Sequence, residues 1–209
     1  MDQIDTGRDE ARSAPAGDRP LILGIGGTTR AGSSSELVLR AALDAMQLHG
    51  ARTEILAGPD LIIPLYAPEN SERHPGAQKL VKLLRACDGL VIASPGYHGS
   101  ISGMIKNALD YAEDTARDPR PYLDGIPVGC IACAYGWQAA GSTLHALRNI
   151  VHALRGWPTP LGLTVNTTTP LFDDTGALDG DVRAKLAILS AQVMRSPSAP
   201  HNQAAALPA

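Results

Sequence analysis

The sequence predicts an α/β protein, built as a three-layer α/β/α sandwich around a five-stranded parallel sheet. Short runs of Val, Ile and Leu alternate along the chain with longer segments of helical periodicity, and these runs are apolar throughout. Strands of that kind belong to parallel sheets that helices cover on both faces. Such sheets bind ligands beyond the carboxyl ends of their strands, so we expect the chemistry in the segments that follow the strands.

Each predicted strand is a short apolar run bounded by turn-forming residues. The runs at 21–26 and 90–93 are the clearest, since both consist only of Leu, Ile, Val, Ala and Gly. The predicted strands are residues 21–26, 52–56, 90–93, 127–134 and 160–165, with residues 61–65 as a further extended stretch beside the second.

Each predicted helix shows apolar side chains that recur every three or four residues. Leu37 and Ala41 share a face of the first helix, Pro75 suits the first turn of the second, and Gly156 ends the fourth. The predicted helices are residues 34–48, 75–86, 103–113, 140–154 and 179–194.

One domain, residues 20–195, is expected between two tails. Residues 1–19 and 196–209 are rich in Ala, Pro and polar side chains, and we predict that both are disordered. The N-terminal stretch lacks the apolar segment of a secretory signal, and no apolar run approaches the roughly 18 residues of a membrane span. We therefore expect a soluble cytoplasmic protein with no membrane partner.

The charge balance argues against nucleic acid as a partner. The formal net charge is −3, and aromatic residues make up 4% of the chain. A duplex needs a basic surface to neutralise its phosphates, and single strands also need aromatic side chains on which bases stack. No nucleic-acid site is predicted.

The three cysteines are an odd number, which argues against a disulfide framework. Cys130 and Cys133 form a C-x-x-C pair, but it lies inside a predicted strand and not at a helix N-terminus, where a thiolate is stabilised. Side chains three apart in a strand point to opposite faces. We expect two buried structural thiols rather than a redox or metal pair. His145 and His152 are also wrongly spaced for a helical zinc pair, so no metal site is predicted.

The segment after the first strand, GGTTRAGSSS at residues 26–35, is predicted to bind a phosphate group. Glycines let the backbone approach a ligand, while hydroxyls and the N–H groups of the following helix surround an anion. Arg30 adds a charge and a bidentate fork. A helix cap alone does not need five hydroxyls beside an arginine. Because the segment has no lysine and no metal-binding carboxylates, a terminal monophosphate suits it better than a nucleoside triphosphate or a dinucleotide.

The segment after the third strand begins SPGYHGSIS at residues 94–102, and it suits a flat ring system. Pro95 and Gly96 would shape a ledge whose amides bond ring heteroatoms, and Tyr97 would pack nearby. A phosphate held after the first strand would put the rest of its molecule against this segment, because the third strand neighbours the first. Taken alone, the segment is explained equally well as a strand-to-helix turn capped by a serine.

Both segments resemble those of the NAD(P)H-dependent FMN reductases. GTTRAGSSS at 27–35 is similar to the family's G-S-x-R-x-x-S-x-N loop. SPGYHGSISGMIKNALD at 94–110 is similar to its T-P-E-Y-N-x-S-x-P-G-x-L-K-N-A-L-D segment. The resemblance covers roughly residues 20–195. It implies a flavodoxin-like fold with strand order 2-1-3-4-5 and with FMN across the two loops.

The resemblance also implies which residues hold FMN: four on the phosphate, four against the isoalloxazine and a third loop after the fourth strand. These are Thr28, Arg30, Ser33 and Ser35; Pro95, Gly96, Tyr97 and His98; and Tyr135, Gly136 and Trp137. Tyr135 and Trp137 would edge the nicotinamide pocket. Gly96 stands where the family commonly has Glu, and His98 where it has Asn.

The implied function is hydride transfer from NADH or NADPH to FMN, followed by electron transfer to a small-molecule acceptor or a partner monooxygenase. The flavin carries this chemistry, so no catalytic side chain is expected. Relatives of this kind are commonly homodimers or homotetramers. Two alternatives stay open: a quinone, azo or metal-oxyanion reductase with prosthetic FMN, and a flavin-binding module that does not turn over. A serine hydrolase is disfavoured, because the serines of GSISG at 99–103 stand at the wrong offsets for a nucleophile elbow.

Overall fold

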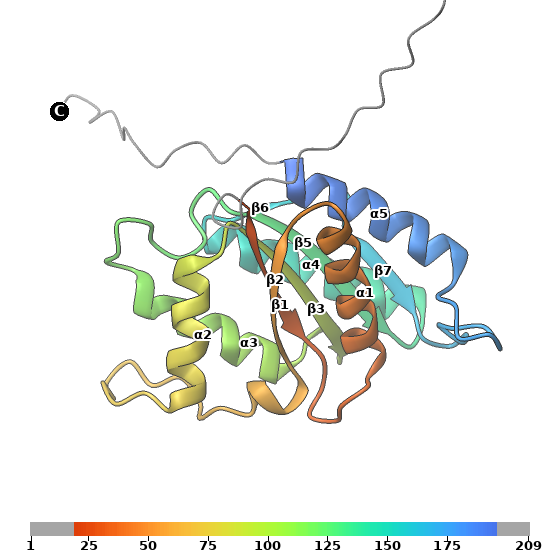
Figure 1. Cartoon of the computed structure of the whole chain (residues 1–209). Helices are drawn as coiled ribbons and strands as arrows, with labels where there is room; N and C mark the ends of the chain where they lie inside the picture. The colour runs from red at the N-terminus through yellow and green to blue at the C-terminus, as the bar shows by residue number, and fades with distance from the viewer. Residues whose placement is uncertain (1–18, 196–209) are drawn as a thin grey trace, which may run out of the picture.

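A central parallel sheet with helices on both faces makes up residues 19–195, the part of the chain that the computed structural model describes (Figure 1). The predicted tails, residues 1–19 and 196–209, fall outside this part except for Arg19. Among the described residues, none of the helices has the length and hydropathy that a bilayer crossing requires.

The parallel strands follow the predicted order. The sheet runs β2-β1-β3-β5, and β6 and β7 both pair with β5 at its far side. This confirms the flavodoxin-like order 2-1-3-4-5, with the fifth strand in two pieces. Pro160, which has no N–H to donate, lies between the pieces. The strands are β1 Leu21–Gly26, β2 Arg52–Ala57, β3 Gly89–Tyr97, β4 Ser100–Ile101, β5 Pro127–Ala134, β6 Trp157–Pro158 and β7 Leu163–Asn166.

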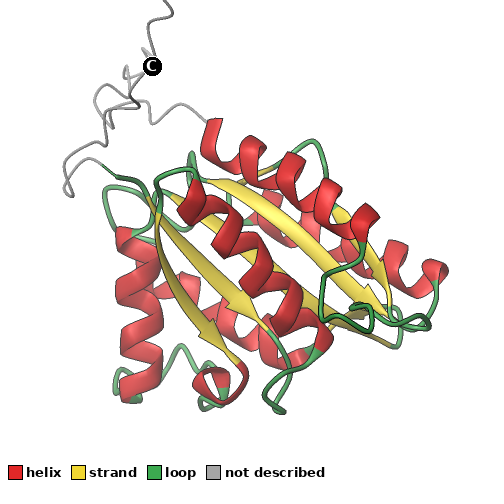
Figure 2. Cartoon of the chain, turned by 45° about the vertical axis from the view of Figure 1, so that its right-hand side comes forward, coloured by secondary structure: helices red, strands yellow, loops and turns green. Residues whose placement is uncertain are grey.

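Two helical layers cover the sheet. The layers consist of α1 and α5 on one face and of α2, α3 and α4 on the other (Figures 1 and 2). Ile22 of β1 packs into the first layer, while Leu23 and Ile25 pack into the second. This two-sided burial is why the strand is apolar at every position. The helices are α1 Ser34–Leu48, α2 Pro75–Ala86, α3 Gly103–Asp110, α4 Trp137–Ala153 and α5 Gly180–Arg195, with 3-10 turns η1 Gly58–Leu61 and η2 Tyr111–Thr115.

The prediction of an extended stretch at residues 61–65 is wrong. The chain leaves β2 through η1, which has Pro59 in its first turn, and then runs as an irregular loop. The carbonyl of Pro64 accepts hydrogen bonds from Asn107 Nδ2 at 2.9 Å and from the Tyr111 hydroxyl at 3.0 Å. These bonds hold the segment over α3 and η2 instead of at the edge of the sheet.

The two cysteines of β5 point to opposite faces, as their spacing predicts. Cys130 is buried under the α2–α4 layer and Cys133 under the α1–α5 layer. Both are free thiols, as is Cys87. Burial raises the pKa of Cys130 and Cys133 to about 12 and that of Cys87 to about 11. The thiolate form is therefore disfavoured in the folded protein.

We expect the stability of the fold to decrease as the pH rises above about 9, because thiols ionise near pKa 9.0 when unfolded and near 11 to 12 when folded. The stability that the three neutral thiols contribute is fully present below the pKa of the unfolded state, and it is lost as the pH rises through the pKa of the folded state. Urea unfolding across this range measures the effect, and a variant with all three cysteines changed to alanine should show a flatter dependence. The native protein should also resist a thiol reagent at about pH 8. Rapid native labelling of all three thiols would contradict this account.

Candidate functional site

A pocket of about 520 Å³ lies at the carboxyl edge of the sheet. The loops after β1, β5 and β7 and the carboxyl ends of β3 and β5 all contribute to its wall, as expected for a doubly wound sheet. Its lining residues are Thr28, Thr29, Arg30, Ser33, Ser34, Ser35, Pro95, Gly96, Tyr97, Cys133, Ala134, Tyr135 and Thr167.

The loop after β1 supplies a cluster of hydroxyls at the start of α1. Ser33 is the N-cap, and its Oγ accepts the N–H of Glu36 at 3.4 Å. The Oγ atoms of Ser33 and Ser35 lie 3.3 Å apart and are buried. The first-turn N–H groups of Ser34 and Ser35 have no acceptor within the helix, as at any helix start. Arg30 is exposed and takes part in none of the ion pairs found among residues 19–195.

The segment after the third predicted strand is a hairpin, not an open loop. β3 continues through Pro95 to Tyr97, turns at His98 and Gly99, and pairs back as β4. His98 and Gly99 have φ of 50° and 84°. Positive φ at both central residues is typical of a two-residue type I′ turn, whose twist matches that of the strands. The hairpin leaves Tyr97 at the pocket and carries His98 to its exposed tip.

Gly96 permits a close approach between the hairpin and α4. A Cβ at this position would lie 2.5 Å from Thr143 Oγ1 and 2.9 Å from Ala134 Cβ. Thr143 is fully buried, and its Oγ1 donates to the Ser100 carbonyl at 3.3 Å. Thr143 therefore occupies the space that a side chain at position 96 would need. This explains a glycine where the resemblance leads one to expect glutamate.

The third loop is tied to the end of β7 through Asn166, a residue that the sequence did not single out. Asn166 Oδ1 accepts the N–H groups of Gly136 and Thr168, both at 3.0 Å. Gly136 has φ 106° and ψ 150°, a conformation essentially restricted to glycine. A polar residue at the end of the last strand was the available signal for this link.

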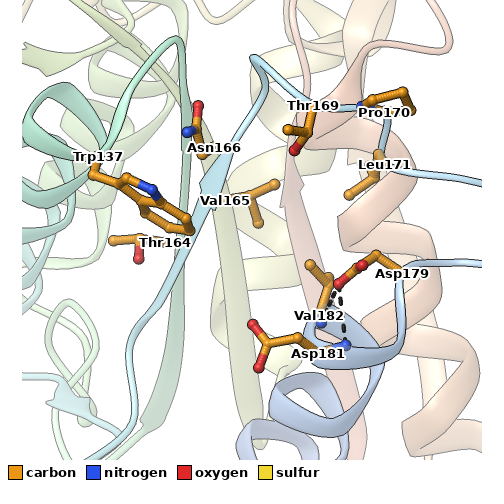
Figure 3. Close-up of a pocket in the computed structure, with 10 residues that line it drawn as sticks. All are labelled: Trp137, Thr164, Val165, Asn166, Thr169, Pro170, Leu171, Asp179, Asp181 and Val182. Carbon is orange, nitrogen blue, oxygen red and sulfur yellow. Dashed lines mark hydrogen bonds between the residues drawn. The ribbon is translucent and has the colours of Figure 1, made fainter.

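A second pocket, of about 240 Å³, lies beyond β7 between the starts of α4 and α5. Figure 3 shows the Trp137 indole beside Thr164, with Val165 and Val182 across the pocket. Asp179 Oδ1 caps α5 here by accepting the N–H groups of Asp181 and Val182, both at 3.0 Å.

The structure does not bring all the predicted site residues into one pocket. Trp137 lines the second pocket, and His98 and Gly136 line neither of the two. α4 begins at Trp137 and not at the predicted residue 140, so the helix start turns this indole toward β7. The larger pocket brings together Thr28, Arg30, Ser33, Ser35, Pro95, Gly96, Tyr97 and Tyr135.

The family model for NADPH-dependent FMN reductases matches residues 20–169. The chain belongs to this family. Membership gives FMN and a nicotinamide nucleotide as the cofactors, as the resemblance implied.

Curated relatives agree with this assignment. The chain is 27% identical to an NAD(P)H-dependent FMN reductase of Pseudomonas aeruginosa, over 79% of this chain and 88% of that protein. It is 38% identical to an FMN-dependent NADPH-azoreductase of Staphylococcus haemolyticus, over 48% of this chain and 53% of the relative. It is 35% identical to an NADPH azoreductase of Bacillus sp., over 41% of this chain and 45% of that protein. The chain thus spans about half the length of these azoreductases.

Solved structures share the fold. An apo NADH:FMN oxidoreductase superimposes with a TM-score of 0.67 at 18% identity, covering 87% of this chain and 92% of that one. A flavodoxin of Streptococcus pneumonia gives a TM-score of 0.55 at 11% identity, covering 83% of this chain and 97% of that one.

We expect Gly96→Glu to lower the free energy of unfolding by about 1–3 kcal/mol, because the new side chain overpacks against Thr143 and Ala134. Urea unfolding measures the loss. The matched control is Gly103→Glu, where a Cβ meets nothing within 4 Å, and its stability should stay near that of the wild type. Gly96→Glu should cost less stability in a Thr143→Ala background than in the wild type, because the Oγ1 atom nearest the new side chain is then absent. A Gly96→Glu variant as stable as the wild type would show that the two segments do not pack this closely.

Proposed function

We propose that this chain is an NAD(P)H-dependent flavin oxidoreductase that binds FMN in the larger pocket. The observation that carries the proposal is that one pocket joins the hydroxyl- and arginine-bearing loop after β1 to the end of β3. The chain's membership of the FMN reductase family supports the choice of ligand. One end of the pocket suits an anion and the other a flat ring, which are the two ends of FMN.

At the anion end, Thr28, Ser33 and Ser35 would donate hydroxyl hydrogen bonds to the phosphate. The unpaired first-turn N–H groups of α1 add donors, and the helix dipole favours negative charge there. Arg30 would complete this end as the positive group that the pocket lining contains.

At the ring end, Pro95, Gly96 and Tyr97 would lie against the isoalloxazine, with Tyr135 beside them. Bound FMN would supply hydride acceptance from the nicotinamide, so the protein contributes position and electrostatics. His98, at the hairpin tip, would contact the ring from the rim. Gly136 would shape the third loop between Tyr135 and Trp137.

The final acceptor is proposed to be a small planar conjugated molecule, such as a quinone or an aromatic azo compound. Tyr97 and Tyr135 are 51% and 82% exposed at the pocket. Exposed rings of this kind offer stacking surfaces to a flat ligand. Several curated relatives bear the name azoreductase, which favours the same acceptor class. A partner monooxygenase that receives reduced FMN is the second candidate, and an oligomer of two or four copies goes with either.

The visible spectrum of the purified protein and the rate of NADH or NADPH oxidation test this function. Oxidation with a quinone or azo dye and without added FMN would support a prosthetic flavin and the planar conjugated acceptor. Activity only with added FMN would favour release of reduced flavin to a partner. A protein that neither binds FMN nor oxidises either nucleotide would contradict the proposal.

Arg30→Met should raise the Kd for FMN about tenfold to a hundredfold, because a charge-assisted bond to phosphate is worth about 1.5–3 kcal/mol. The Kd for riboflavin, which lacks the phosphate, should stay within about twofold. Quenching of flavin fluorescence measures both constants. Arg117→Met, on an exposed residue of the turn after η2, is the control. Equal weakening of FMN and riboflavin would place Arg30 elsewhere than at the phosphate.

A further inference from the structure

A buried carboxylate, Glu36, lies under the loop after β1. Its side chain belongs to the first turn of α1 and is 8% exposed. Oε2 accepts the N–H of Gly32 at 2.9 Å. Oε1 accepts from Arg40 Nε at 3.0 Å and from an Arg40 terminal nitrogen at 2.7 Å. Both oxygens are therefore paired, as a buried charge requires.

The same side chain fills the space between three segments. A Cβ built on Gly27 would lie 3.4 Å from Glu36 Cβ, and one on Gly58 would lie 3.6 Å from Glu36 Oε2. Gly58, which begins η1 after β2, also approaches the Thr28 carbonyl, 3.3 Å from its ideal Cβ. The loop thus has its hydroxyls on the pocket side and Glu36 on the opposite side.

A negative charge next to an anion site opposes the anion. Any favourable contribution of Glu36 to an anion site must therefore come from how it positions the loop, not from its charge. Glu36 also uses the N–H of Gly32, a donor that an anion would otherwise attract. The ion pair with Arg40, which is 51% exposed, is a helix pair of the kind worth only about 0.3–0.5 kcal/mol. The bond to Gly32 is the contact that links the carboxylate to the loop.

We propose that Glu36 is a positioning residue for the phosphate end of the site. Through the Gly32 N–H it holds the loop of residues 28–35 in the form whose hydroxyls and Arg30 line the pocket. This inference rests on the proposed function, since it concerns how the same site is kept in shape. The donors left to the phosphate are then the hydroxyls, Arg30 and the first-turn N–H groups of α1.

The test compares Glu36→Leu, which removes the acceptor, with Glu36→Gln, which keeps an acceptor oxygen for Gly32. Glu36→Leu should raise the Kd for FMN at least about tenfold and leave that for riboflavin within about twofold. The amide hydrogen of Gly32 should exchange at least about tenfold faster in the flavin-free variant. Glu36→Gln should stay within about threefold of the wild type in all three measurements.

Two further variants separate positioning from general stability. Arg40→Met removes the ion pair but not the Gly32 bond, so its FMN affinity should stay near that of the wild type. Asp118→Leu is the matched control, because it removes a carboxylate that pairs with Arg85 far from the pocket lining. Whatever its effect on the melting temperature, this variant should leave the ratio of the FMN and riboflavin constants unchanged.

If the wild-type protein binds FMN, three outcomes would overturn the inference about Glu36 and leave the proposed function intact. These are unchanged FMN affinity in Glu36→Leu, equal weakening of FMN and riboflavin, and a Glu36→Gln variant that fails as Glu36→Leu does. Wild-type protein that binds neither flavin overturns the proposed function itself. The two failures are therefore distinguishable.

Discussion

Parallel pairing of β1, β3 and β5 is the constraint on which the rest of this molecule depends. Gly26 at the end of β1 pairs with Ala93, but β3 continues beyond it to Tyr97, with β5 beside it as far as the Pro95–Cys133 pair. The carboxyl edge of the sheet is therefore stepped. The loop after β1 therefore begins one or more residues short of the carboxyl ends of β3 and β5, which extend beyond it on one side. A pocket forms at this step because the strands differ in length, not because a separate domain covers them.

Close packing of α1 on β1 fixes the ends of the loop after β1. A Cβ on Gly24 would lie 2.6 Å from Leu43 Cδ1, so the helix lies unusually close to the strand. The connecting loop of residues 27–33 is therefore fixed at both ends, by the end of β1 and by the N-cap Ser33 of α1. The hydroxyls of that loop and the start of α1 consequently come from one short run of sequence.

This locality explains what could be predicted from the sequence. The alternation of strands and helices and the hydroxyl loop follow from consecutive residues and periodicity, whereas the strand order came from the family resemblance. The structure brings Thr28, Arg30, Ser33 and Ser35 to one pocket. The hairpin was not predicted, because Pro95 and Gly96 resemble strand breakers when their neighbours on β5 are unknown. Glu36 and Asn166 were missed for a related reason. An acidic residue in a first helical turn and a polar residue at a strand end have ordinary local explanations, and their partners at Gly32 and Gly136 become visible only in the folded chain.

The ring end depends instead on contacts between segments far apart in the sequence, namely β3, β4, β5, α4 and β7. Thr143 of α4 fills the space beside Gly96 and bonds the Ser100 carbonyl of β4. Because Thr143 and Trp137 belong to the same helix, the hairpin and the third loop are held by one element. Asn166 then links that loop to β7. The two ends of the pocket therefore depend on different parts of the molecule: the anion end on a local loop and its buried carboxylate, the ring end on long-range packing through α4. If FMN binds here as proposed, phosphate affinity and the geometry of the ring contacts would accordingly change independently.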